Sequence, residues 1–85
     1  MPEVSRFYGI VITMHYKDHD PPHFHARYQG REAEMDLRGG IREGGLPPKA
    51  LTLVREWVHL HRPELEHNWD LAAEGRSVQK IAPLA

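Results

Sequence analysis

The first half of the chain alternates apolar and polar residues with a period of two, and the second half repeats its apolar residues with a helical period. Residues 7–16 are almost all apolar or aromatic, and the alternation resumes over residues 23–29 and 32–38. Turn residues and two prolines predict a loop over residues 17–22, because proline donates no backbone hydrogen bond. The pattern predicts an antiparallel meander of three strands, with a short fourth strand around Ile41 as a further candidate.

From Leu46 onward the pattern is helical. Pro47 and Pro48 fit the first turn of a helix, and Pro63 is expected to end this helix and begin a second one that runs to about Glu74. The predicted fold class is therefore α+β: a three- to four-stranded antiparallel β-meander followed by a two-helix hairpin packed on one sheet face. We expect a single domain over residues 1–85, with strands within 5–45, helices within 47–75 and a short tail over 76–85. Residues 80–84 of this tail are a candidate edge strand.

The strand registers follow from the position of glycine and from parity. Gly30 is placed first in a two-residue type II′ turn, which pairs Ala26 with Met35 and sets His25 opposite Asp36 on the polar face. Arg27 then lies opposite Glu34. In the preceding hairpin, pairing apolar with apolar positions forces His15 to face either His23 or His25.

Composition narrows the chemistry. The chain has 85 residues, seven His and no Cys, so disulfides, thiolate-bound metals and thiol nucleophiles are excluded. The net charge is −1 and neither half is strongly charged, so no basic arm supports non-specific binding to nucleic acid or anionic membrane. We expect no membrane association and a cytoplasmic location, because neither a signal-peptide pattern nor a bilayer-length apolar run is present.

The histidines gather between residues 15 and 25, which suggests a metal site. His23 and His25 are two apart on a predicted strand, so their side chains point the same way with Cα atoms roughly 6.7 Å apart. Both imidazoles can then converge on one divalent ion such as zinc or nickel. A further ligand is available from His15 across the hairpin or from the loop, where His19, Asp18 and Asp20 are candidates; the predicted metal set is His15, His23, His25 and His19.

A metal-free interpretation uses the same face. Asp36 opposite His25 would fix the imidazole tautomer as in a general base, and Arg27 would stabilise a developing anion or a phosphate. The predicted catalytic residues are thus His25, Asp36 and Arg27. A purely structural interpretation is also open, in which these residues form a ladder of cross-strand ion pairs.

Several segments together resemble a known family. They are Ser5-Arg6-Phe7-Tyr8-Gly9-Ile10-Val11-Ile12, Asp18-His19-Asp20-Pro21-Pro22-His23-Phe24-His25-Ala26, Leu46-Pro47-Pro48-Lys49-Ala50-Leu51, Val54-Arg55-Glu56-Trp57 and Asn68-Trp69. Nearly the whole chain resembles small bacterial proteins known as the domain-of-unknown-function family 4160. The resemblance implies no established activity. It implies free-standing chains of this length that occur beside a second small domain, in a two-gene arrangement like that of toxin–antitoxin pairs.

Two function classes follow. The first is a small cytoplasmic interaction or regulatory module, one half of a toxin–antitoxin-like pair, with the adjacent-gene product or a second copy as partner. Its His-rich sheet face would act on RNA within the complex. The alternative is a divalent metal-binding or metal-dependent hydrolytic protein that uses the His23-Phe24-His25 segment.

Overall fold

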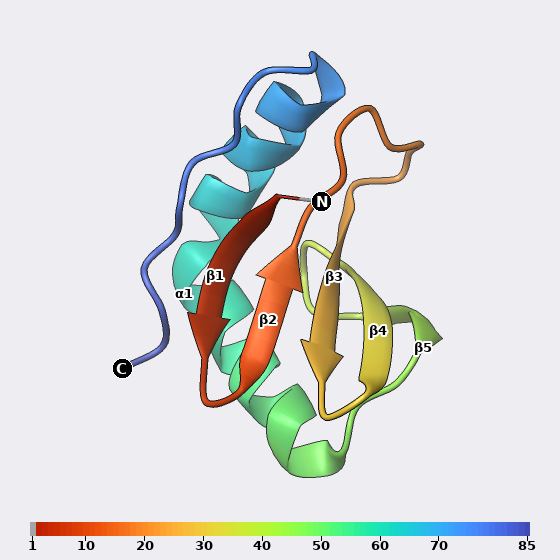
Figure 1. Cartoon of the computed structure of the whole chain (residues 1–85), viewed down its shortest axis with the longest axis vertical. Coiled ribbons are helices and arrows are strands. Elements are labelled where there is room, and N and C mark those ends of the chain that lie inside the picture. Colours follow the sequence, from red (N-terminus) through yellow and green to blue (C-terminus); the bar gives the residue numbers. More distant parts are fainter. Residues whose placement is uncertain (1) are drawn as a thin grey trace.

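The computed structural model describes residues 2–85, which form an antiparallel sheet of five strands and one long helix. The strands lie side by side in chain order, and the helix runs along one face of the sheet (Figure 1). The α+β class and the meander are confirmed, whereas the number of strands and helices differs from the prediction. The elements are β1 (Glu3–Phe7), β2 (Ile10–Thr13), β3 (His23–Tyr28), β4 (Arg31–Asp36), β5 (Ile41–Gly44) and α1 (Pro48–Ala73).

The additional strand arises because the apolar run over residues 7–16 contains a hairpin turn. Tyr8 and Gly9 both have positive φ, of 50° and 79°. Positive φ at both central residues defines a type I′ turn, whose twist matches that of paired strands. The run of apolar residues hid this turn, since only Gly9 marks it in the sequence. The short strand expected around Ile41 is present as β5.

The predicted register of the β3–β4 hairpin is wrong by two residues. Its turn is centred on Gln29 and Gly30, with φ of 48° and 78°, so it is type I′ and not type II′. His25 therefore lies opposite Glu34, and Arg27 lies opposite Glu32. A shift of two leaves every side chain on its predicted face, because faces alternate with period two.

The predicted two-helix hairpin is also wrong. Residues 48–73 form one helix with a kink, where His61 has non-helical angles of φ −125° and ψ 22°. Pro63 causes the kink because its ring lacks the N–H that the carbonyl of His59 would accept. The chain bends there without reversing, since Val58 and Leu65 are seven residues apart and both face the core.

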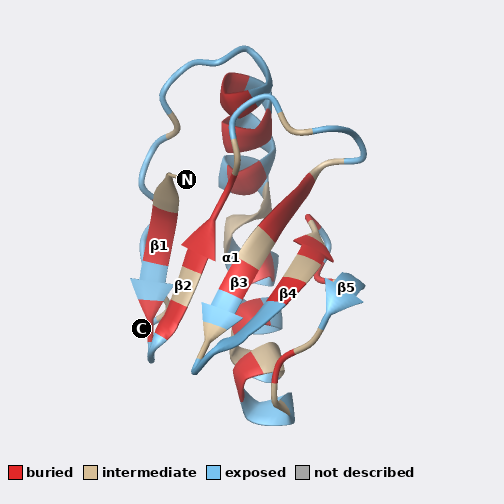
Figure 2. Ribbon diagram, turned by 45° about the vertical axis from the view of Figure 1, so that its right-hand side comes forward, coloured by how far each residue is buried: buried red, intermediate tan, exposed pale blue. Residues whose placement is uncertain are grey.

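The core lies between α1 and the sheet, and the opposite face of the sheet is left uncovered (Figure 2). Trp57 is fully buried and its ring lies 5.4 Å from that of Phe7 and 6.2 Å from that of Phe24, measured between centroids. The C-terminal tail forms no strand within residues 76–85, contrary to prediction, yet it runs beside β1. Its Ile81 is buried, and the Ile81 backbone N–H donates to the Val4 carbonyl at 2.8 Å.

Among residues 2–85, no helix has the length and apolar character that crossing a bilayer requires.

Candidate metal centre

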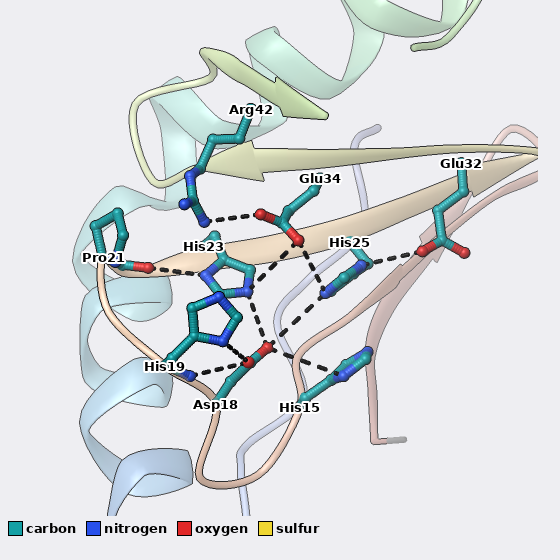
Figure 3. Close-up of polar contacts among 9 residues, drawn as sticks. All are labelled: His15, Asp18, His19, Pro21, His23, His25, Glu32, Glu34 and Arg42. Carbon is teal, nitrogen blue, oxygen red and sulfur yellow. Dashed lines mark hydrogen bonds and ion pairs between the residues drawn. The ribbon is translucent and has the colours of Figure 1, made fainter. Parts of the chain in front are cut away.

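The histidine cluster lies at one end of the open sheet face, next to the loop that joins β2 to β3 (Figure 3). β3 carries His23 and His25, and β4 carries Glu34 opposite His25. The loop supplies Asp18. A backbone hydrogen bond of 2.9 Å from Lys17 N–H to the carbonyl of Ala72 ties this loop to the end of α1.

Four polar atoms face a common point in this cluster. The Nε2 atom of His23 lies 2.8 Å from Asp18 Oδ2 and 3.9 Å from Glu34 Oε1. The Nε2 atom of His25 lies 3.9 Å from the same Asp18 oxygen and 4.0 Å from the same Glu34 oxygen. Figure 3 shows the two carboxylates on opposite sides of this point, with the two imidazole nitrogens between them.

The second polar atom of each histidine is held from outside the cluster. His23 Nδ1 lies 2.8 Å from the carbonyl oxygen of Pro21, which can only accept, so Nδ1–H is the donor. His25 Nδ1 lies 3.1 Å from Glu32 Oε2 and donates to it in the same way. Both Nε2 atoms are thereby directed inward, which is the arrangement found around metal-binding histidines.

The carboxylates have outer partners too. Arg42 donates from Nη1 to Glu34 Oε2 at 2.7 Å, which leaves Glu34 Oε1 for the common point. The backbone N–H of His19 donates to Asp18 Oδ1 at 2.9 Å, which leaves Asp18 Oδ2. All four inward atoms are therefore oriented by hydrogen bonds that their own side chains make on the far side.

The cluster is largely shielded from solvent. The His23 side chain is 1% exposed and its ring lies 5.3 Å from that of Trp69, while the His25 side chain is 12% exposed. His25 Nε2 is buried and has no hydrogen-bond partner within residues 2–85. A buried polar atom without a partner is costly unless a ligand or water satisfies it.

Electrostatics keep Asp18 charged. Burial raises the pKa of this carboxyl. The hydrogen bond from the His19 backbone and the neighbouring His23 lower the pKa, and together they outweigh burial, so the pKa lies below its ordinary value. A carboxylate with a depressed pKa presents a full negative charge to the common point at neutral pH.

His15 lies next to this group. Its ring stacks on that of His25 with centroids 4.1 Å apart, and its Nδ1 atom is 3.9 Å from Asp18 Oδ2. Burial lowers the pKa of His15, and the charge of His25 lowers it further, so the neutral form is favoured. Two overlapping triads of donor atoms result, each with all atoms within 4.8 Å of one another: His23, His25 and Glu34, and His15, Asp18 and His25.

The structure brings together three of the four predicted metal residues. His23 and His25 point inward and His15 borders them, whereas His19 is 76% exposed and contacts Asp18 Oδ1 from outside. Glu34 was missed because the shifted register had assigned it to Arg27. Its signal was the alternation of Glu32 and Glu34 opposite the His-x-His segment.

The predicted His25–Asp36 contact does not form. Asp36 lies opposite His23, and its Oδ1 atom accepts backbone hydrogen bonds from Arg38 and Gly40 at 2.8 and 2.9 Å. This carboxylate therefore holds the β4–β5 turn. Arg27 lies on the same face as His25, but its nearest charged partner is Glu32, at 3.9 Å.

The donor set suits a divalent transition metal. Imidazole nitrogen and carboxylate oxygen bind such ions at about 2.0–2.2 Å, which places neighbouring donors about 3–3.5 Å apart. The four separations between an imidazole nitrogen and a carboxylate oxygen, 2.8–4.0 Å, lie on both sides of this range.

Comparison with known proteins gives one relationship. No curated protein matches the chain, and no solved structure does. Residues 9–70 match the model of a family described as a domain of unknown function, DUF4160. The match covers well over half of the chain and includes β2, β3, β4 and every residue of the histidine cluster. The chain belongs to the DUF4160 family, as its segments indicated.

Proposed function

We propose that this protein binds one divalent transition metal ion, with zinc and nickel as the leading candidates, through His23, His25, Asp18 and Glu34. The observation that carries the proposal is the buried Nε2 atom of His25. This atom has no partner within residues 2–85, and it faces the same point as His23 Nε2 and the two carboxylate oxygens. A cation at that point satisfies all four atoms at once.

The charges support a cation. Asp18 and Glu34 bring two carboxylates close to two imidazoles in a mostly shielded place, and burial makes unpaired negative charge costly. Arg42 offsets Glu34 from outside, whereas the charge partners of Asp18 are histidines alone, among them His23 and His19. The metal would replace the direct 2.8 Å contact between His23 and Asp18, and its binding would release any proton held there.

The site has an open side. A surface pocket of about 330 Å³ is lined by His25, Glu32, Glu34, Glu43 and Gly44, so water can approach the cluster from β4 and β5. A bound metal supplies Lewis acidity and lowers the pKa of a coordinated water. This supports metal-dependent hydrolysis as the activity of the centre.

The test is metal binding by untagged protein, measured by elemental analysis after purification and by calorimetric titration of the chelator-treated chain. We expect one ion per chain. Glu34→Gln and His25→Ala should each weaken binding by more than the 10–100-fold typical of losing an outer partner.

The chain offers matched controls. Glu56 and His59 are exposed on α1, away from the cluster, so Glu56→Gln and His59→Ala should both leave the affinity unchanged. Circular dichroism of each variant separates loss of metal from loss of fold. Wild-type affinity in folded Glu34→Gln and His25→Ala would refute the proposed ligand set.

A protein partner is a second proposal. The interaction or regulatory module and its toxin–antitoxin-like arrangement stay predictions from the family resemblance. What supports a partner is β5, an edge strand whose four residues are all exposed, including Ile41. Co-expression with the adjacent-gene product tests this: co-purification supports it, and a monomer that never co-purifies contradicts it.

A further inference from the structure

A second, larger pocket lies on the same open face, near the turns of both hairpins. Its volume is about 530 Å³. The turns at residues 8–9 and 29–30 lie at the same end of the sheet, opposite the end that carries the 14–22 loop (Figure 1). The pocket is lined by three arginines, and it reaches Thr13, which pairs with His25.

We propose that this pocket binds the phosphate group of a small phosphate ester, which is the substrate or ligand of the metal centre. The inference rests on the proposed metal function for its link to the centre, but the pocket has its own evidence. That evidence is the charge of its arginines, a buried hydroxyl without a hydrogen-bond partner, and lining residues that lie next to His25.

Two of the three arginines are free to bind an anion. Arg6 is already paired with Glu3, at 2.8 Å. Arg27 is 57% exposed and approaches only Glu32, at 3.9 Å, and the other oxygen of that carboxylate accepts from His25. Arg31 makes no ion pair within residues 2–85. A planar guanidinium donates two parallel hydrogen bonds to phosphate, so Arg27 and Arg31 match this ligand class.

A buried hydroxyl points to the same kind of ligand. Thr13 is 4% exposed, and its Oγ1 atom is buried with no hydrogen-bond partner in the described chain. A hydroxyl can donate to an anionic oxygen, and leaving it unsatisfied costs free energy. Thr13 lines the pocket, so a phosphate oxygen bound there can accept a hydrogen bond from the Thr13 hydroxyl.

The pocket adjoins the metal centre. Thr13 lies directly opposite His25, and Arg27 follows His25 by two residues on the same face, with Cα atoms roughly 6.7 Å apart. Glu32 lines the pocket and also accepts from His25 Nδ1. His25 and Arg27 are successive residues on this face of β3. A phosphate held by Arg27 therefore lies next to His25, which is a proposed metal ligand.

The charge balance favours one phosphate over a polynucleotide. The pocket carries three arginines against two glutamates, and the whole chain has net charge −1. Tracking a nucleic-acid backbone needs an extended basic surface, which this balance does not provide. A ligand with a single phosphate group fits Arg27 and Arg31, because Arg27 has only the distant Glu32 as a partner, at 3.9 Å, and Arg31 has no ion pair within residues 2–85.

The experiment measures binding of inorganic phosphate and of phenyl phosphate to the metal-loaded protein by calorimetry. We expect Arg27→Gln to weaken both by about 10-fold or more, and Thr13→Val to weaken both less strongly. Metal affinity should be unchanged in either variant. Arg38→Gln is the matched control, because Arg38 is exposed and lies outside this pocket.

The outcomes separate the two proposals. Metal binding with no phosphate binding, or equal phosphate affinity in wild type and Arg27→Gln, overturns the phosphate pocket and leaves the metal centre standing. Phosphate binding that depends on Arg27 in a chain that binds no metal supports the pocket and refutes the metal centre. The single-phosphate ligand would be wrong, and nucleic acid favoured, if a single-stranded RNA bound more tightly than phenyl phosphate and its affinity fell with salt concentration as steeply as the release of several counterions requires.

Discussion

At the scale of single residues, the site depends on which nitrogen of each imidazole is hydrogen-bonded to a residue outside the cluster. Pro21 and Glu32 hold the Nδ1 atoms of His23 and His25, so the Nε2 atoms are left for a ligand. His15 differs, since its Nε2 is buried without a partner among residues 2–85 and its pKa is lowered. In the metal-free chain His15 therefore behaves as a neutral ring stacked on His25.

The lowered pKa of His15 predicts a pH dependence of folding. The folded pKa lies below the ordinary value of 6.5, so near and below that pH the unfolded state binds more protons than the folded state. Stability from this group is present above pH 6.5 and is lost as pH falls through the folded pKa. We expect chemical denaturation in chelator to show a steeper loss of unfolding free energy below pH 6.5 in wild type than in His15→Gln.

Titration of the Asp18 carboxyl does not contribute in the pH range of this measurement. Its pKa lies below the ordinary value of 3.8, so the stability that it contributes is lost only at lower pH. Identical pH profiles of wild type and His15→Gln between about pH 6.5 and 4.5 would contradict the assignment of His15.

At the scale of elements, the metal centre depends on β5, although β5 contributes no ligand. Arg42 on β5 fixes Glu34 on β4. β5 can approach β4 because Gly44 has φ of +69° and because a Cβ at this position would collide with the backbone carbonyl of Glu32. The glycine therefore positions the strand that orients a proposed ligand.

Gly44→Ala should detach β5 from β4. The strained φ and the collision predict a loss of about 1–3 kcal/mol in unfolding free energy. Losing Arg42 as an outer partner predicts metal affinity about 10–100-fold weaker. Denaturant titration and metal titration of the same sample measure both effects.

The neighbouring glycine provides the comparison. A methyl group at Gly45 would meet no heavy atom within 4 Å, so Gly45→Ala should change stability by no more than about 0.5 kcal/mol and leave metal affinity intact. Equal behaviour of the two alanine variants would show that β5 does not support the site.

Sequence patterns identified faces better than pairings. Alternation correctly placed His23, His25 and Arg27 on one polar face, because parity survives an even register error. The predicted pairing of His25 with Asp36 is wrong because Gly30 fits two turns: it is the first central residue of a type II′ turn and the second central residue of a type I′ turn. The centre of the turn differs by one residue between the two, so the residue paired with His25 differs by two. The same error hid Glu34. The break at Pro63 was located correctly but overestimated, since a proline can kink a helix that packing holds together.

At the scale of the whole molecule, stability and chemistry are divided between the two faces of the sheet. α1 and the tail build the core on one face, and both pockets of the proposed site lie on the other. The tail is fastened by Asn68, whose side-chain amide donates to the Gln79 carbonyl at 2.8 Å and accepts from the Gln79 N–H at 2.9 Å. The indole of Trp57 adds a hydrogen bond to the Ala82 carbonyl at 2.9 Å.

Asn68→Ala should loosen the tail without altering the metal centre. Asn68 is 1% exposed, and the variant loses both hydrogen bonds to Gln79, so we expect a decrease of about 1–3 kcal/mol in unfolding free energy. Hydrogen exchange at the Ile81 amide, which is bonded to Val4, should accelerate. The metal affinity should stay at the wild-type value, because the tail contacts the sheet at β1, away from β3 and β4.

His67→Ala is the control, since His67 is the exposed neighbour of Asn68 on the same helix. It should leave stability within about 0.5 kcal/mol and Ile81 exchange unchanged. If Asn68→Ala weakened metal binding as much as it weakened folding, the two faces would be coupled, and the division of stability from chemistry would be wrong. If it changed neither, the two hydrogen bonds to Gln79 would not be what holds the tail against β1.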